Sequence, residues 1–194
     1  MLSFLRKLTA ATPAPVAAPV AAVTPVAEKV DPFMLGLHDA QLSGWFNEET
    51  GELYKGFPVS ADDIVIDVGC GDGGNMQFCG RRGARLIVAD IDGDKIEQAR
   101  QRLSETPARS VECHVTDGNP LPIADATATR VVSTEVLEHV DDPAQFLAEL
   151  VRVGQSGALY LLSVPHPSSE DLQKDIAAPA YYEKPNHIRI ISEE

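Results

Sequence analysis

A glycine-rich loop flanked by aspartates is the part of this chain best suited to hold a ligand. Gly69, Gly71 and Gly74 follow a short apolar run with the spacing GxGxxG, which lets the backbone approach a bound ligand closely. Asp67 precedes the first glycine by two residues, and Asp72 lies inside the loop. Two carboxylates beside a pyrophosphate would repel it. The loop therefore favours a ligand that carries positive charge.

Two further aspartates follow the next two apolar segments. Asp90 stands about twenty residues beyond the start of the loop, where a carboxylate can accept hydrogen bonds from both hydroxyls of a ribose. Asp117 follows the third segment, where its carboxylate can accept from an adenine amino group. Each aspartate alone is also compatible with a helix cap or a solvated loop. Together, at the ends of three consecutive strands, they predict a site for S-adenosylmethionine (SAM), which has a ribose, an adenine, an ammonium and a sulfonium group.

Alternating strands and helices are expected to position these residues. Short apolar runs bounded by glycine or proline predict buried strands, and apolar residues at helical spacing predict the helices between them. This alternation indicates βαβ units and an α/β fold with a parallel sheet. The expected strands cover residues 63–68, 85–90, 110–116, 130–133 and 158–164. The expected helices cover residues 75–82 and 93–103, and a third begins after Asp142.

Local signals mark where two of these helices begin or end. Asp142 is expected to cap the third helix, with Pro143 in its first turn and Gln145 closing a capping box. Gly83 is expected just beyond the end of the first helix, where a glycine readily adopts a left-handed backbone.

Five segments of the chain resemble the class I SAM-dependent methyltransferases, specifically those of the small-molecule type. The segments are VIDVGCGDGG, VADIDGDKIEQAR, VTDGNPLP, VVSTEVLEHVDDP and LAELVRVGQSGALYLLSVP. The resemblance covers about residues 62–164. It implies a Rossmann-like, doubly wound, mainly parallel sheet with helices on both faces. No pattern for the strands that follow the fifth strand in that family is recognisable after residue 164, so we expect residues 31–194 to form a C-terminally truncated methyltransferase domain.

The resemblance also assigns roles to individual residues. It implies an enzyme that transfers a methyl group from SAM to a small-molecule or saccharide-type acceptor, at oxygen. The residues implied to bind the cofactor are Asp67, Gly69, Gly71, Gly73, Asp90, Asp117 and Thr134. The residues implied on the catalytic side are Glu135, His139 and His166. Trp45 is expected either in a lid helix packed on the sheet or in a wall of the acceptor pocket.

Two other functions remain open from the sequence. The missing strands favour a non-catalytic SAM-binding or interaction module. A NAD-dependent dehydrogenase is disfavoured by Asp67, because that position is usually apolar in NAD-binding folds.

The segment Glu135-Val136-Leu137-Glu138-His139 raises the question of a metal site. On a helical turn, Glu135, Glu138 and His139 would share one face and could converge on a divalent cation. Some methyltransferases use this spacing for metal ligands, whereas others carry Leu-Glu-His without a metal. We predict that these side chains pack and pair locally and that the chain has no metal site. His38, His114 and His187 stand in no ligand spacing and are assigned no role.

Composition limits the possible partners and the compartment. The chain has 29 acidic and 16 basic residues, giving a formal net charge of −13, and so disfavours nucleic acid as a partner. Its three cysteines form no CxxC pair, which indicates a reducing, cytoplasmic environment. Residues 1–30 are rich in alanine and proline and are expected to form a flexible leader. Residues 1–8 could give a weak peripheral membrane contact, and no apolar run is long enough for a membrane span.

Overall fold

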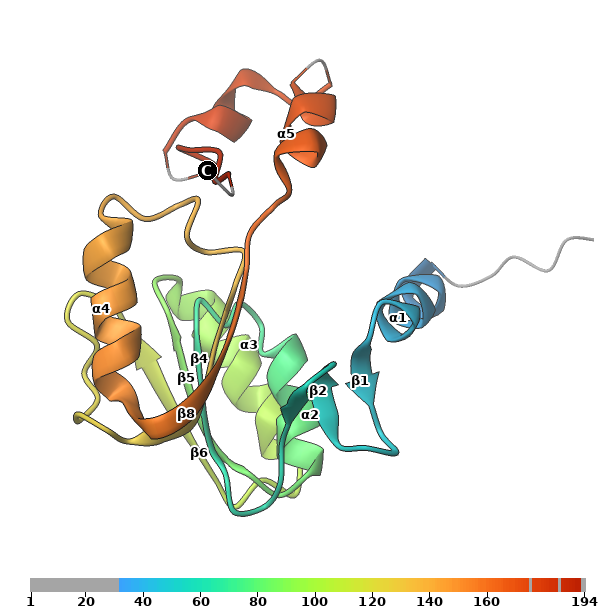
Figure 1. Cartoon of the computed structure of the whole chain (residues 1–194), viewed down its shortest axis with the longest axis vertical. Helices are drawn as coiled ribbons and strands as arrows, with labels where there is room; N and C mark the ends of the chain where they lie inside the picture. The colour runs from blue at the N-terminus through green and yellow to red at the C-terminus, as the bar shows by residue number, and fades with distance from the viewer. Residues whose placement is uncertain (1–31, 175, 185, 193–194) are drawn as a thin grey trace, which may run out of the picture.

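The computed structural model describes residues 32–174, 176–184 and 186–192, so the expected leader lies outside the described residues. Its centre is a five-stranded sheet with the order β6-β5-β4-β7-β8 (Figure 1). All neighbouring strands of this sheet are parallel, which confirms the α/β class. The strands are β4 (Ile64–Val68), β5 (Arg85–Asp90), β6 (Ser110–Val115), β7 (Ala128–Thr134) and β8 (Gly154–Ser163).

Helices cover both faces of this sheet, as Figure 1 shows. The helices α2 (Gly74–Arg81) and α3 (Gly93–Ser104) pack on one face, and α4 (Pro143–Val153) packs on the other. Side chains alternate across a strand, so neighbouring residues of β4 enter different apolar clusters. Val65 packs in the cluster of α2 and α3, whereas Ile66 packs in that of α4. This two-sided burial explains why the central strands β4 and β5 read as continuous apolar runs.

The predicted helix signals are largely confirmed. Asp142 caps α4 by accepting a hydrogen bond from the backbone N–H of Gln145 at 3.0 Å, and Gly83 follows α2 with a φ of +79°. The capping box is wrong, because the Gln145 side chain donates instead to Oδ1 of Asn119 at 2.7 Å. Gln145 therefore ties α4 to the loop after β6.

A small antiparallel sheet precedes the central sheet and was not expected from the sequence. It contains β1 (Trp45–Asn47), β2 (Glu52–Tyr54) and β3 (Phe57–Pro58), and it follows the helix α1 (Pro32–Leu42). Trp45 therefore lies in a strand, and the expectation of a lid helix around it is wrong. The physical reason is tight turn chemistry: Oδ1 of Asn47 accepts two backbone N–H groups, and Gly51 has a φ of +75°.

The tryptophan ring packs inside the domain. Its centroid lies 4.9 Å from that of Tyr54, and both rings pack against the cluster beneath α2. Trp45 does not line the cavity described below, so the second expectation for it, a pocket wall, does not fit this cavity.

The segment after β8 turns back over the carboxyl ends of the strands (Figure 1). It contains the short helix α5 (Pro167–Gln173) and a 3-10 turn at Pro179–Tyr182. Two hydrogen bonds and an ion pair dock it. The N–H of Ile188 donates to the carbonyl of Glu138 at 3.0 Å, Arg189 donates to the carbonyl of Asp141 at 3.1 Å, and Lys184 pairs with Asp141. Within the described residues no strand follows β8, and no helix has both the length and the apolar character needed to cross a membrane.

Candidate functional site

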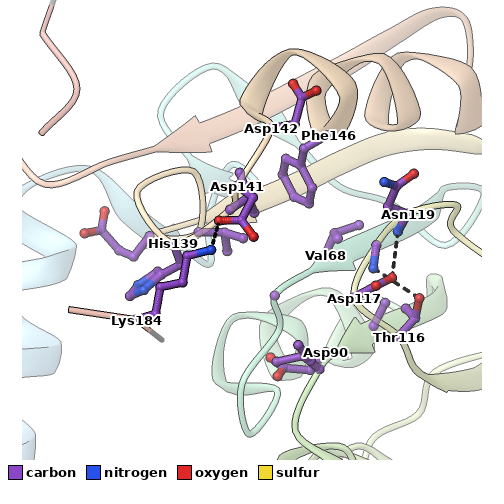
Figure 2. A pocket seen from close by; sticks show the side chains of 17 residues that line it. Val68, Asp90, Thr116, Asp117, Asn119, His139, Asp141, Asp142, Phe146 and Lys184 are labelled. Atoms are coloured by element: carbon purple, nitrogen blue, oxygen red, sulfur yellow. Dashed lines mark hydrogen bonds and ion pairs between the residues drawn. The ribbon is translucent and has the colours of Figure 1, made fainter. Parts of the chain in front are cut away.

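A cavity of about 690 Å³ opens at the carboxyl ends of four adjacent strands, β6, β5, β4 and β7. In a parallel sheet this edge is the usual place for a ligand. Figure 2 shows two groups of side chains around the cavity. The first group comes from the ends of β4, β5 and β6 and includes Val68, Gly69, Ala89, Asp90, Thr116 and Asp117. The second comes from beyond β7 and includes Glu135, Val136, His139, Asp141, Phe146 and Lys184.

The charged side chains that line the cavity are mainly acidic. The carboxylates are those of Asp90, Asp117, Glu135, Asp141 and Asp142. Lys184 also lines the cavity, and it forms an ion pair with Asp141. This single positive charge leaves the lining with an excess of negative charge. Because opposite charges attract strongly in a partly enclosed site, the lining favours a cationic ligand over a pyrophosphate.

Asp90 joins the glycine loop to the end of β5. Its Oδ2 accepts a hydrogen bond from the N–H of Gly71 at 2.8 Å, and its Oδ1 accepts from the N–H of Asp92 at 2.9 Å. The carboxylate is therefore held at the cavity wall by two backbone groups. Each carboxylate oxygen has further lone pairs, so Asp90 can also accept from the hydroxyls of a ribose.

The glycine loop follows β4 directly and turns beneath the cavity. The N–H groups of Gly69 and Cys70 both donate to the carbonyl of Ala89, at 2.8 and 3.1 Å. Gly69, Gly71 and Gly73 all have positive φ values, which glycine adopts at little cost. This loop brings the backbone of Gly69 to the cavity surface, as the GxGxxG spacing predicted.

Gly69 is the position of the loop least able to accept a side chain. A Cβ there would lie 2.2 Å from Cγ2 of Val136, on top of the strain of a φ of +80°. We expect Gly69→Ala to lower the free energy of unfolding by about 1–3 kcal/mol, the cost of overpacking, measured by urea denaturation. Gly71→Ala is the matched control, because a Cβ there meets no atom within 4 Å. Equal losses in the two variants would contradict this role of the Val136 contact.

Asp67 is buried beneath the loop on the α2 side of the sheet. It is 1% exposed, and its Oδ1 has no hydrogen-bond partner. Burial, and then the negative charge of Asp90, raise the pKa of Asp67 to about 7. The carboxyl is thus poised to ionise when a cation arrives nearby.

The other residues implied to bind the cofactor are placed as follows. Asp117 lines the cavity, and its Oδ1 accepts from the N–H of Asn119 at 3.0 Å. Thr134 ends β7 and accepts a hydrogen bond from the side chain of Asn75 at 3.3 Å. The other four residues implied to bind the cofactor are not among those that line the cavity: Gly71, Gly73, Asp67 and Thr134.

The three residues implied on the catalytic side are separated in the structure. Glu135 and His139 line the cavity. His166 instead begins α5, where its Nδ1 accepts from the N–H of Ser168 at 3.1 Å. His166 is therefore not among the residues around this cavity.

Residues 135–139 do not form the helical turn that would place Glu135, Glu138 and His139 on one face. Glu135 has a φ of +55°, and residues 137–139 form a turn closed by the N–H of His139 and the carbonyl of Val136. The donor atoms that come together are those of Glu138, His139 and His187, all within 4.8 Å of one another. His187 was assigned no role from the sequence, because its 48-residue separation from His139 carries no ligand-spacing signal.

Comparisons with known proteins identify the family of this domain. A family model described as "Methyltransferase domain" matches residues 66–162, about half of the chain. A probable S-adenosylmethionine-dependent methyltransferase of Mycolicibacterium smegmatis is 33% identical over 129 residues, covering 66% of this chain and 48% of that protein. A ubiquinone biosynthesis O-methyltransferase of Hahella chejuensis is 38% identical over 95 residues, covering 48% of this chain and 40% of that protein.

A solved structure shares the fold. Geranyl diphosphate C-methyltransferase of Streptomyces coelicolor has a TM-score of 0.54 and 22% identity, covering 68% of this chain and 46% of that one. The chain spans less than half the length of the curated relatives named here. The parallel sheet, the glycine loop at its carboxyl edge and the matching family model together show that this chain belongs to the class I S-adenosylmethionine-dependent methyltransferase family.

Proposed function

We propose that this domain transfers the methyl group of SAM to a hydroxyl oxygen of a small-molecule or saccharide-type acceptor. The observation that carries the proposal is the joint lining of one cavity by Asp90 and Asp117 on one side and by Glu135 and His139 on the other. A cofactor held by the first pair would present its methyl group towards the second pair.

The proposed reaction is an in-line displacement at the methyl carbon. The acceptor oxygen attacks that carbon, the bond from carbon to sulfur breaks, and the sulfonium becomes the neutral thioether of S-adenosylhomocysteine. The acceptor hydroxyl loses its proton to the carboxylate of Glu135. The chain contributes mainly the alignment of the two reactants, and His139 positions the acceptor next to Glu135.

Glu135 has the geometry expected of a functional residue. Its φ of +55° is rare for a residue other than glycine, and such strain is concentrated at functional sites. Two bonds to β8 hold it there: the hydroxyl of Ser163 donates to Oε1 at 2.8 Å, and the N–H of Glu135 donates to the carbonyl of Ser163 at 2.9 Å. The carboxylate is thus fixed at the cavity wall by a neighbouring strand.

Two observations support the class of acceptor. The net charge of −13 and the acidic lining oppose a polyanionic substrate such as a nucleic acid. The Hahella chejuensis relative is by name an O-methyltransferase, which supports oxygen as the methylated atom.

Methyl transfer from labelled SAM to a panel of phenols, sugars and amines tests the proposal. We expect Glu135→Gln to lower kcat by about 10²- to 10⁴-fold, the usual contribution of a positioned base, with SAM affinity unchanged in calorimetry. Glu49→Gln is the control, because Glu49 is exposed in the turn after β1 and should leave kcat unchanged.

Three outcomes would overturn parts of the proposal. Binding of SAM without transfer to any acceptor class would favour a non-catalytic SAM-binding module. Binding of NAD in place of SAM would favour a dehydrogenase. Transfer to amines but not to hydroxyls would overturn oxygen as the methylated atom.

A further inference from the structure

Glu138 is a buried carboxylate that the proposed reaction does not use. The residue is 1% exposed, and neither Oε1 nor Oε2 has a hydrogen-bond partner. An ionised carboxylate in such a place is strongly destabilising unless a cation or several donors compensate it. The surroundings of Glu138 therefore indicate what binds there.

Two imidazole rings stand next to this carboxylate. Nε2 of His139 lies 3.8 Å from Oε1 of Glu138, and the rings of His139 and His187 meet edge to face with centroids 4.8 Å apart. One potential ligand atom from each of the three residues lies within 4.8 Å of the others. Metal–ligand bonds of about 2.0–2.2 Å place neighbouring ligand atoms roughly 3–4 Å apart. Small side-chain movements would bring the three atoms onto one ion.

Glu170 orients the second imidazole. Nδ1 of His187 lies 2.7 Å from Oε1 of Glu170, a carboxylate that is itself only 1% exposed. In the neutral tautomer in which Nδ1 donates to this carboxylate, Nε2 keeps the lone pair that a metal requires. Histidine ligands of metals typically donate their other N–H to a carboxylate or a carbonyl in this way.

The backbone holds the two parts of this cluster together. Ile188, the residue after His187, donates its N–H to the carbonyl of Glu138 at 3.0 Å, and Tyr182 donates its hydroxyl to the carbonyl of Glu170 at 2.9 Å. His187 is thus fixed against the loop after β7 by contacts that are independent of its ring.

We propose that Glu138, His139 and His187 bind one divalent transition-metal ion at the edge of the cavity, with Glu170 as the residue that positions His187. One carboxylate and two imidazoles suit zinc, manganese or cobalt, whereas magnesium and calcium prefer oxygen ligands alone. The proposal departs from the sequence-based expectation of no metal, because that expectation considered Glu135 as the third ligand and did not include His187.

The role of this ion rests on the proposed function. His139 lines the cavity, so an ion bound to it would meet an acceptor hydroxyl. The ion would lower the pKa of that hydroxyl, and the proton would pass to Glu135. His139 would then position the acceptor through the metal.

Calorimetric titration of the full, EDTA-treated and dialysed chain with Zn²⁺, together with the visible absorption of bound Co²⁺, tests the site. We expect one equivalent to bind. Glu138→Gln and His187→Gln should each weaken binding at least about 100-fold, and Glu170→Gln about 10- to 100-fold, as for other residues that orient ligands. His114→Gln is the matched control: His114 also faces a glutamate, with Nε2 2.9 Å from Glu112, but away from the cluster, and its affinity should be unchanged.

Failure of the metal site can be told apart from failure of the proposed function. SAM binding and circular dichroism show that each variant is folded. No bound metal in the wild type, or equal affinity in His187→Gln, would overturn the site, even if methyl transfer continues in EDTA. A metal bound as expected, with no transfer to any acceptor, would leave the site standing and overturn the function.

Discussion

The Asp90→Ala variant is expected to bind SAM about 10- to 150-fold more weakly than the wild-type chain, a loss of roughly 1.5–3 kcal/mol. The carboxylate offers acceptors for the ribose hydroxyls, and it also accepts the N–H groups of Gly71 and Asp92. Alanine removes the acceptors for the ribose hydroxyls, and it also removes the hydrogen bonds that hold the glycine loop to the end of β5. Calorimetric titration with SAM, or with S-adenosylhomocysteine, measures the change.

The control for this variant is Asp94→Ala. Asp94 is an exposed residue in the first turn of α3 and does not line the cavity. A second variant, Asp90→Asn, retains one oxygen acceptor and should lose less affinity than alanine. An unchanged affinity in Asp90→Ala would show that the cofactor does not contact the end of β5.

Asp67→Asn is expected to abolish part of the pH dependence of folding stability. The pKa of Asp67 is raised from 3.8 in the unfolded chain to about 7 in the fold by burial and by Asp90. Between these values the folded state holds a proton that the unfolded state has lost. The stabilisation from this proton is complete below pH 3.8 and disappears as the pH rises through 7. It amounts to about 2 kcal/mol between pH 5.5 and pH 8.

Urea denaturation of the ligand-free chain at these two pH values is the measurement. The wild type should lose about 2 kcal/mol more stability than Asp67→Asn on going from pH 5.5 to pH 8. The Asn side chain can also change the free energy of unfolding by an amount that does not vary with pH. Comparing the pH dependence of the two proteins removes that constant difference. Parallel pH profiles would show that Asp67 is ionised throughout this range in the folded chain.

Asp63, immediately before the same strand, should give the opposite sign. Burial alone would raise its pKa, but hydrogen bonds from Ser60 and Thr129 and the charge of Arg130 together lower it. Its ionised form therefore stabilises the fold above the unfolded pKa, and that stabilisation is lost as the pH falls. Asp63→Asn should destabilise the chain at pH 8 and destabilise it less at acidic pH, which is the reverse of the pH dependence expected for Asp67→Asn.

The sequence predicted the central sheet and one side of the cavity well. The central strands β4 and β5 are buried on both faces and read as apolar runs, and their last residues, Val68 and Asp90, line the cavity. Because the carboxyl ends of parallel strands meet at one edge of the sheet, Asp117 and Gly69 were expected at one site, and both line the cavity. The cap of α4 by Asp142 is equally local and was equally predictable.

The rest depended on contacts that no local pattern encodes. Trp45 lies in a hairpin of very short strands, whose periodicity is too brief to distinguish from a loop. The left-handed backbone of Glu135 breaks the helical spacing on which a shared face was based. His187 reaches Glu138 only because the chain after β8 folds back over the strand ends.

The cavity is divided along the chain, and this has a consequence for evolution and engineering. The side that we propose binds the cofactor comes from residues 68–119, and the other side comes from residues 135–184, as Figure 2 shows for Asp90 and Asp117 on one side and for His139 and Lys184 on the other. If the proposed roles of the two sides hold, mutations or recombination after β7 would change acceptor recognition while the proposed SAM-binding half stays unchanged. A chimaera that joins residues before β7 of this chain to the corresponding residues after β7 of a relative would then take its acceptor specificity from the relative.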